Sequence, residues 1–232
     1  MKFKKLGLFL FLITMIFCLS GCFNKKESDA LRFKEEYESL NGVESKNGKV
    51  YPEVLVDENN IIEYVNMKEA SDIVDEGTGV FYFGYASCPW CRNAISVLLK
   101  AAENTDLEKI YYVDMEDKRD VMTLNEAGEV VITKKAAKGY YDLVDELEDI
   151  LLDYNIKNDE GNEVSTGMKR IYVPLVVFVV NGEIVDYHLD TVASQKDPYV
   201  SLNEEQQIEL YNIYSDGIHE VLGDVCMEEE HC

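Results

Sequence analysis

The residues best suited to chemistry in this sequence are two cysteines, Cys88 and Cys91, in the segment Cys88-Pro-Trp-Cys91. Zinc sites also use this spacing, but zinc normally needs two further ligands at a matching distance along the chain. Here the uncharged run 80–85 predicts a buried strand before the pair, and the apolar pattern of 93–103 predicts a helix that opens inside the motif. A strand, a CxxC pair and a helix in this order favour redox chemistry. A sulfur at a helix N-terminus is stabilised as the nucleophilic thiolate, and the second cysteine, one turn inside, can attack the resulting mixed disulfide.

The first 21 residues have the proportions of a secretory signal peptide. Lys2, Lys4 and Lys5 precede an almost wholly apolar run over 6–19, which is short for a membrane span. The run ends in Leu-Ser-Gly-Cys22, which resembles a bacterial lipobox. That resemblance implies a lipid-modified Cys22 as the mature N-terminus, holding the protein on the extracytoplasmic face of the cell membrane. A plain secretory signal or an uncleaved anchor helix are the alternatives.

The charge of the chain limits its partners. With 22 basic and 45 acidic residues the net charge is −23, and loss of the three signal-peptide lysines makes it more negative still. A nucleic-acid backbone would be repelled, which excludes nucleic-acid binding as an expected function. Anionic lipid headgroups would be repelled too, so covalent lipid attachment fits better than a basic membrane-binding patch.

A second cysteine pair, Cys226 and Cys232, follows the last predicted helix, while Cys18 is lost with the signal peptide. Three interpretations of the pair remain open. It could form a structural disulfide in an exported protein, or act as a second redox pair that exchanges electrons with the first. Together with His231 it could also bind Cu(I) or zinc. We assign no metal and no cofactor to the protein.

The elements that must position these residues follow from periodicity and turn signals. We expect a tether and N-terminal helix in 22–60, a domain in 61–222 with an enlarged insertion at 115–170, and a cysteine-containing tail in 223–232. The order of strands and helices predicts an α/β fold, with a central mixed sheet covered by helices on both faces. The expected strands are 61–65, 80–85, 109–113, 175–180 and 183–187, and the expected helices are 30–40, 67–75, 93–103, 140–154 and 203–222. Turns are expected at 125–128, 158–161 and 181–182.

Two segments together resemble the thioredoxin superfamily. They are Val-Phe-Tyr-Phe-Gly-Tyr-Ala-Ser-Cys-Pro-Trp-Cys over 80–91 and Val-Pro-Leu-Val-Val-Phe-Val-Val-Asn-Gly-Glu over 173–183. The resemblance implies a thioredoxin-like fold in which Cys88 is the nucleophile and Cys91 the resolving cysteine. It also implies a cis peptide bond before Pro174. The residues expected to contact substrate are Pro89, Trp90, Val173 and Pro174.

The sequence departs from the thioredoxin pattern six residues before the first cysteine, where Tyr82 replaces a buried acid. The usual proton acceptor for Cys91 is therefore missing. Arg92, directly after the motif, is expected to be solvated rather than to act on Cys88.

These features predict a lipid-anchored thiol–disulfide oxidoreductase that acts on exported proteins or peptides, with a membrane redox partner possible and its direction open. The whole chain also resembles thioredoxin-like lipoproteins of Gram-positive bacteria, some of which are described as bacteriocin transport accessory proteins. Two alternatives of other classes remain. One is a peptide-binding or transport accessory module without redox turnover, and the other is a Cu(I)-handling protein.

Overall fold

A five-stranded mixed sheet forms the centre of the protein. The structure is a computed structural model that describes residues 28–103 and 105–223. The central strand β2 (Gly79–Gly84) is buried at every position. It pairs in parallel with β3 (Ile110–Asp114) on one side and in antiparallel with β8 (Leu175–Val180) on the other. The outer strands are β1 (Ile62–Tyr64), parallel to β3, and β9 (Glu183–Leu189), antiparallel to β8. The sheet order is therefore β1-β3-β2-β8-β9, and the predicted mixed α/β architecture is confirmed.

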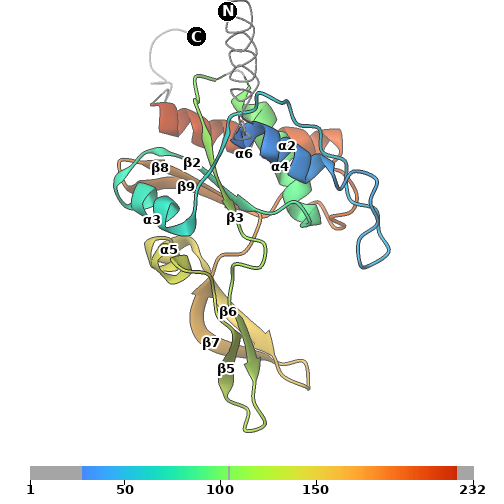
Figure 1. Cartoon of the computed structure of the whole chain (residues 1–232), viewed down its shortest axis with the longest axis vertical. Helices are drawn as coiled ribbons and strands as arrows, with labels where there is room; N and C mark the ends of the chain where they lie inside the picture. Colours follow the sequence, from blue (N-terminus) through green and yellow to red (C-terminus); the bar gives the residue numbers. More distant parts are fainter. Residues whose placement is uncertain (1–27, 104, 224–232) are drawn as a thin grey trace, which may run out of the picture.

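Helices cover both faces of the sheet (Figure 1). They are α2 (Asp29–Glu38), α3 (Met67–Glu76), α4 (Pro89–Ala102), α5 (Tyr140–Glu146) and α6 (Glu204–Leu222). Alternate residues of β2 point to opposite faces, as the pleat of a strand requires. Val80 and Tyr82 pack with residues of α2, α4 and α6, while Phe81 and Phe83 pack with residues of α3 and α5. The sheet thus has a hydrophobic core on each side.

Local sequence signals explain where several helices begin. Ser28 is the N-cap residue of α2, and its hydroxyl oxygen accepts a hydrogen bond from the backbone N–H of Leu31. Asn66 and Asn203 each form a capping box at the start of α3 and α6. The Asn181-Gly182 turn between β8 and β9 has positive φ at both residues, which is the backbone that this pair favours.

Two hairpins form a projection that we call the arm. One hairpin joins β4 (Val121–Leu124) to β5 (Val130–Lys134), and the other joins β6 (Leu152–Lys157) to β7 (Glu163–Arg170). Figure 1 shows the arm extending away from the sheet and its helices, which we call the body. The expected turns at 125–128 and 158–161 lie at the tips of these hairpins. The arm lies between β3 and β8 in the chain. Since β3 ends and β8 begins beside the end of β2, the arm is attached at that edge of the sheet.

The prediction of one helix over 140–154 was wrong. Helix α5 ends at Glu146, a short 3-10 helix covers Glu148–Ile150, and β6 begins at Leu152. Leu143, Leu147 and Leu151 are buried at the spacing of a helix, which explains the expectation. The residues after them pair with β7, and this partner lies too far along the chain for a periodicity argument to detect.

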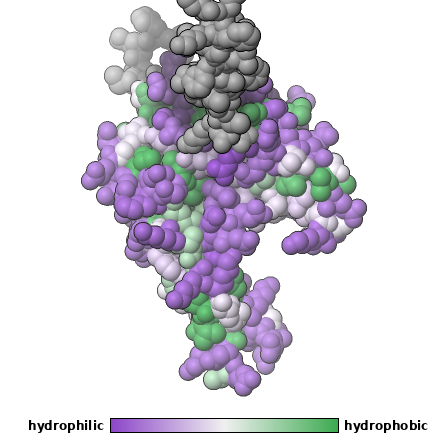
Figure 2. Space-filling view, viewed as in Figure 1, coloured by the Kyte–Doolittle hydropathy of each residue, from purple (hydrophilic) through white to green (hydrophobic). Residues whose placement is uncertain are grey.

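Most of the surface in Figure 2 is hydrophilic, in keeping with the high content of charged residues. Among the described residues, no helix is both long and apolar enough to cross a membrane. The predicted signal peptide, Cys22, and the pair Cys226 and Cys232 with His231 lie outside the described residues.

Candidate functional site

The turn from β2 into α4 positions the two cysteines. Cys88 is the N-cap residue of α4, and its sulfur accepts a hydrogen bond of 3.2 Å from the backbone N–H of Cys91. Pro89 occupies the first helical position, where its lack of an N–H costs nothing. The helix therefore opens inside the motif, as predicted. Both cysteines are free thiols in the structure.

The two sulfurs differ in their access to solvent. Cys88 is 5% exposed, and Cys91 is 0% exposed within the core cluster that includes Tyr82. Cys88 is thus less accessible than an open nucleophile, although part of it still reaches the surface. Trp90 is half-buried and packs against the same cluster. Both cysteines are thus buried residues, and Cys88 is the one of the two that keeps some exposed area.

The surroundings of the pair separate the pKa values of its two thiols. The hydrogen bond from the Cys91 thiol lowers the pKa of Cys88, and burial opposes this effect. The backbone N–H groups of Cys91 and Trp90 and the positive charge of Arg119 lower the Cys88 pKa further. Burial raises the pKa of Cys91 well above its ordinary value, and the neighbouring Cys88 raises it too. Of the two thiols, Cys88 is therefore the one that loses its proton more readily.

Arg92 is not solvated, contrary to the prediction. Its side chain is fully buried and donates to the backbone oxygens of Pro52 at 2.7 Å and Tyr37 at 2.8 Å. It also donates to the amide oxygen of Asn41 at 2.6 Å. A buried guanidinium is tolerated because these acceptors satisfy its donors. Arg92 therefore ties the segment after α2 to the motif helix.

The cation that acts on Cys88 is Arg119, which sequence reasoning missed. Arg119 lies in the loop between β3 and β4, inside the predicted insertion. No spacing rule connects it to the CxxC motif, so only the fold could reveal it.

The segment before β8 lies beside the chain that leads to Cys88. The peptide bond between Val173 and Pro174 is cis, as the resemblance implied. Phe83 pairs with Leu175, so the register extended by one residue places Pro174 opposite Gly84. Val173 is half-buried and packs against both core clusters. The structure thus gathers all six predicted residues of this site, which include Pro89 and Trp90, at one end of the sheet.

Tyr82 fills the position where a thioredoxin has a buried acid. Its hydroxyl donates to the backbone oxygen of Cys91 at 2.9 Å and lies 3.5 Å from the hydroxyl of Tyr37. Burial raises the pKa of Tyr82 well above its ordinary value, so the side chain stays a neutral donor. Tyr82 supports the Cys91 backbone and cannot serve as the missing base.

Three cavities lie near the motif helix. One, of about 390 Å³, lies between α4 and α6, where Asn93 and Val97 face Leu202 and Tyr211. Another, of about 420 Å³, lies toward the C-terminal end of α4. The third, of about 320 Å³, is lined by Tyr85 and Ser87 from the loop that carries Cys88 and by residues at the base of the arm. We consider this third cavity the relevant one because it adjoins the reactive loop.

The chain matches no protein-family model, and no curated protein is significantly similar to it. Among the described residues, no group of His, Cys, Asp and Glu side chains could hold a metal ion. The fold and site therefore define a mixed α/β protein with a pair of unequal thiols at a helix N-terminus.

Proposed function

We propose that the protein is a thiol–disulfide oxidoreductase with a thioredoxin-like fold. The observation that carries the proposal is the position of the Cys88 sulfur at the N-terminus of α4, where it accepts a hydrogen bond from the backbone N–H of Cys91 three residues on. The opposite directions of the two pKa shifts agree with this position. A nucleophile must be available as thiolate, whereas a resolving thiol must stay protected until the mixed disulfide has formed. The mixed sheet and the cis peptide bond before Pro174 are compatible with the fold and support the proposal.

The exchange takes two steps. The Cys88 thiolate attacks one sulfur of a substrate disulfide, a bond forms between them, and the other substrate sulfur leaves and takes up a proton. Cys91 then loses its proton and attacks the Cys88 sulfur, which releases the second substrate thiolate and forms the Cys88–Cys91 disulfide. Two electrons pass to the substrate. The reverse sequence oxidises a substrate dithiol, and the reduction potential relative to a partner sets the direction.

We propose that these substrates are exported proteins or peptides. The supporting observation is the signal-like segment 1–21 with its lipobox-like end, from which we infer that Cys22 carries the membrane anchor. Disulfides persist in that compartment, so an enzyme placed there meets its substrates. A membrane redox partner could then return the Cys88–Cys91 pair to its working state.

A trapping experiment tests the proposal. The full-length Cys91→Ser variant should accumulate mixed disulfides through Cys88, because the resolving thiol is gone. They would be seen after acid quenching and thiol alkylation on non-reducing gels. The matched control is the Cys88→Ser/Cys91→Ser double variant, which retains Cys226 and Cys232 and should trap nothing at the motif. Equal trapping by both variants, or none by either, contradicts the redox proposal and leaves a binding module as the better description.

A further inference from the structure

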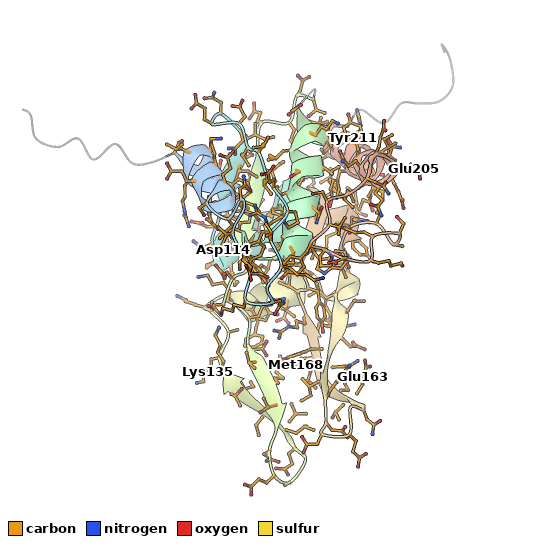
Figure 3. All side chains as sticks on the ribbon, turned by 90° about the vertical axis from the view of Figure 1, so that its right-hand side faces the viewer. Asp114, Lys135, Glu163, Met168, Glu205 and Tyr211 are labelled. Carbon is orange, nitrogen blue, oxygen red and sulfur yellow. The ribbon has the colours of Figure 1, made fainter. Side chains whose placement is uncertain are left out.

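The cavity of about 320 Å³ beside the Cys88 loop joins the body to the arm. Tyr85 and Ser87 line it from the motif loop, and Arg119, Lys134 and Arg170 line it from the arm and its base. Figure 3 labels Asp114, the last residue of β3, in the body near the level where the arm begins. A ligand in this cavity would touch both the reactive loop and the insertion. Its volume lies within the range of small-ligand sites.

Some of the positively charged side chains that line this cavity have a carboxylate partner, and others have none. Arg170 pairs with Asp120 at 2.9 Å, and Lys134 pairs with Asp117 at 3.1 Å. Arg119 lies within 4.0 Å of no carboxylate of the described residues. One of its N–H groups donates to the backbone oxygen of Ile171 at 3.3 Å, which leaves other donors of the guanidinium available.

The cavity also contains an acid that could compete for Arg119. Glu116 lines the cavity, but its carboxylate accepts a hydrogen bond of 2.6 Å from the Ser87 hydroxyl and it is exposed. Arg119 therefore remains a half-buried cation without a carboxylate partner among the described residues, in a chain whose net charge is −23. Lys46 lines the same cavity and is also in no ion pair of the described residues, but it is exposed. In such a chain, an unpaired guanidinium at a cavity is a candidate ligand contact because it binds carboxylates with good geometry.

Arg119 lies near the reactive loop because it lines the same cavity as Ser87, the residue directly before Cys88, and Tyr85. In keeping with this position, its charge lowers the pKa of Cys88. A carboxylate held by Arg119 would therefore lie near the loop that presents Cys88 to a disulfide.

We propose that Arg119 is a specificity-determining residue that binds a carboxylate of the disulfide substrate in the cavity between the Cys88 loop and the arm. This inference rests on the proposed oxidoreductase function and adds the chemical class of substrate. The carboxylate can come from an Asp or Glu side chain of a polypeptide close to its cysteine, or from a small amino-acid disulfide such as cystine.

Reduction kinetics with paired substrates test the inference. The reduced full-length protein is mixed with two disulfide peptides that are identical except for Glu or Gln beside each cysteine. A second pair compares cystine with its dimethyl ester, which lacks the free carboxylates. For the wild type, the second-order rate constant of reduction should be about tenfold higher for the carboxylate-bearing member of at least one pair, as expected for a hydrogen bond to a charged group. High salt should reduce the preference.

The variants Arg119→Gln and Lys134→Gln complete the design. Both remove one positive charge from the same cavity, but Lys134 is already paired with Asp117. The preference should fall to about one in Arg119→Gln and persist in Lys134→Gln. Because both members of a pair meet the same Cys88 thiolate, the ratio of their rates cancels any effect of Arg119 on that thiolate.

Each outcome has a distinct meaning. Preference in the peptide pair alone identifies a polypeptide source, and preference in the cystine pair alone identifies a small disulfide; both support the inference. Equal turnover within both pairs, or a preference that survives Arg119→Gln, overturns the inference and leaves the proposed function intact. If the wild type exchanges with none of the four disulfides, the oxidoreductase proposal fails and the role of Arg119 fails with it.

Discussion

The body and the arm of this protein are stabilised in different ways. Every residue of β2 in the body is buried between helices, whereas β6 in the arm alternates between exposed and half-buried residues. Each arm hairpin has only two strands, a size that has little stability by itself. The body therefore relies on apolar burial, and the arm relies on contacts at its base.

Several contacts at the base of the arm involve Arg170. Its guanidinium pairs with the buried Asp120 and lies 4.0 Å over the ring of Tyr154. The hydroxyl of Tyr154 accepts a hydrogen bond of 3.3 Å from the backbone of Met122, which links the two hairpins. The thiol pair therefore lies in the buried body, while the proposed carboxylate contact lies at the base of the arm.

The largest effect on stability should come from emptying the core of the body. Phe178 of β8 is fully buried, and its ring lies so close to Gly217 of α6 that a Cβ there would be 2.5 Å away. Phe178→Ala should lower the free energy of unfolding by about 3–5 kcal/mol, because it removes apolar contacts and leaves a cavity. Urea titration followed by circular dichroism measures this loss.

The matching control in the arm is Ile132→Ala. Because Ile132 is 51% exposed, this change should alter the free energy of unfolding by at most about 0.5 kcal/mol. Similar losses for both would remove the distinction between body and arm.

Asp120→Asn should have the next largest effect, and it should be local. The change leaves the guanidinium of Arg170 largely buried without its counter-charge, at a cost of about 3 kcal/mol. Hydrogen exchange should accelerate in 121–134 and 152–170 while β2 and β8 stay protected. The control is Asp117→Asn at the exposed pair with Lys134, where about 1 kcal/mol or less is expected. Uniform acceleration across the sheet would show that the arm does not open separately from the body.

A smaller effect is expected for Tyr82→Phe in the body. Loss of the hydroxyl leaves the backbone oxygen of Cys91 without this donor, at a cost of about 1 kcal/mol. The control is Tyr214→Phe in the same core cluster, since the buried hydroxyl of Tyr214 has no hydrogen-bond partner among the described residues. Thermal or urea unfolding should separate the two variants. Equal stability would mean that the Tyr82 hydroxyl contributes nothing to holding the motif.

The smallest effect is expected on the pH dependence of the Cys88 alkylation rate. Because the pKa of Cys88 is lowered, its alkylation rate should rise with pH to a midpoint below the ordinary thiol value of about 8.5. Mass spectrometry of the Cys88 peptide after brief iodoacetamide treatment gives the rate. Cys91 should react far more slowly, because burial raises its pKa and keeps the alkylating reagent from its sulfur. Arg119→Gln should move the Cys88 midpoint upward. A midpoint at or above 8.5 in the wild type would contradict the assignment of Cys88 as nucleophile.

The sequence by itself determined the features that depend on a few adjacent residues. The apolar runs of β2 and β8 and the turn at 181–182 were predicted because each signal is complete within a short segment. The position of Cys88 at the start of a helix belongs to the same class.

Only the tertiary structure decided the features that depend on distant partners. Residues 152–157 form a strand because β7 pairs with them, although their spacing also continues a helical pattern. Arg92 is buried because backbone oxygens from 37 and 52 surround it. Arg119 reaches the site because β3, which precedes it, ends at the same edge of the sheet as β2. The free energy of such contacts depends on which surfaces meet in space, and that information is not contained in any short stretch of chain.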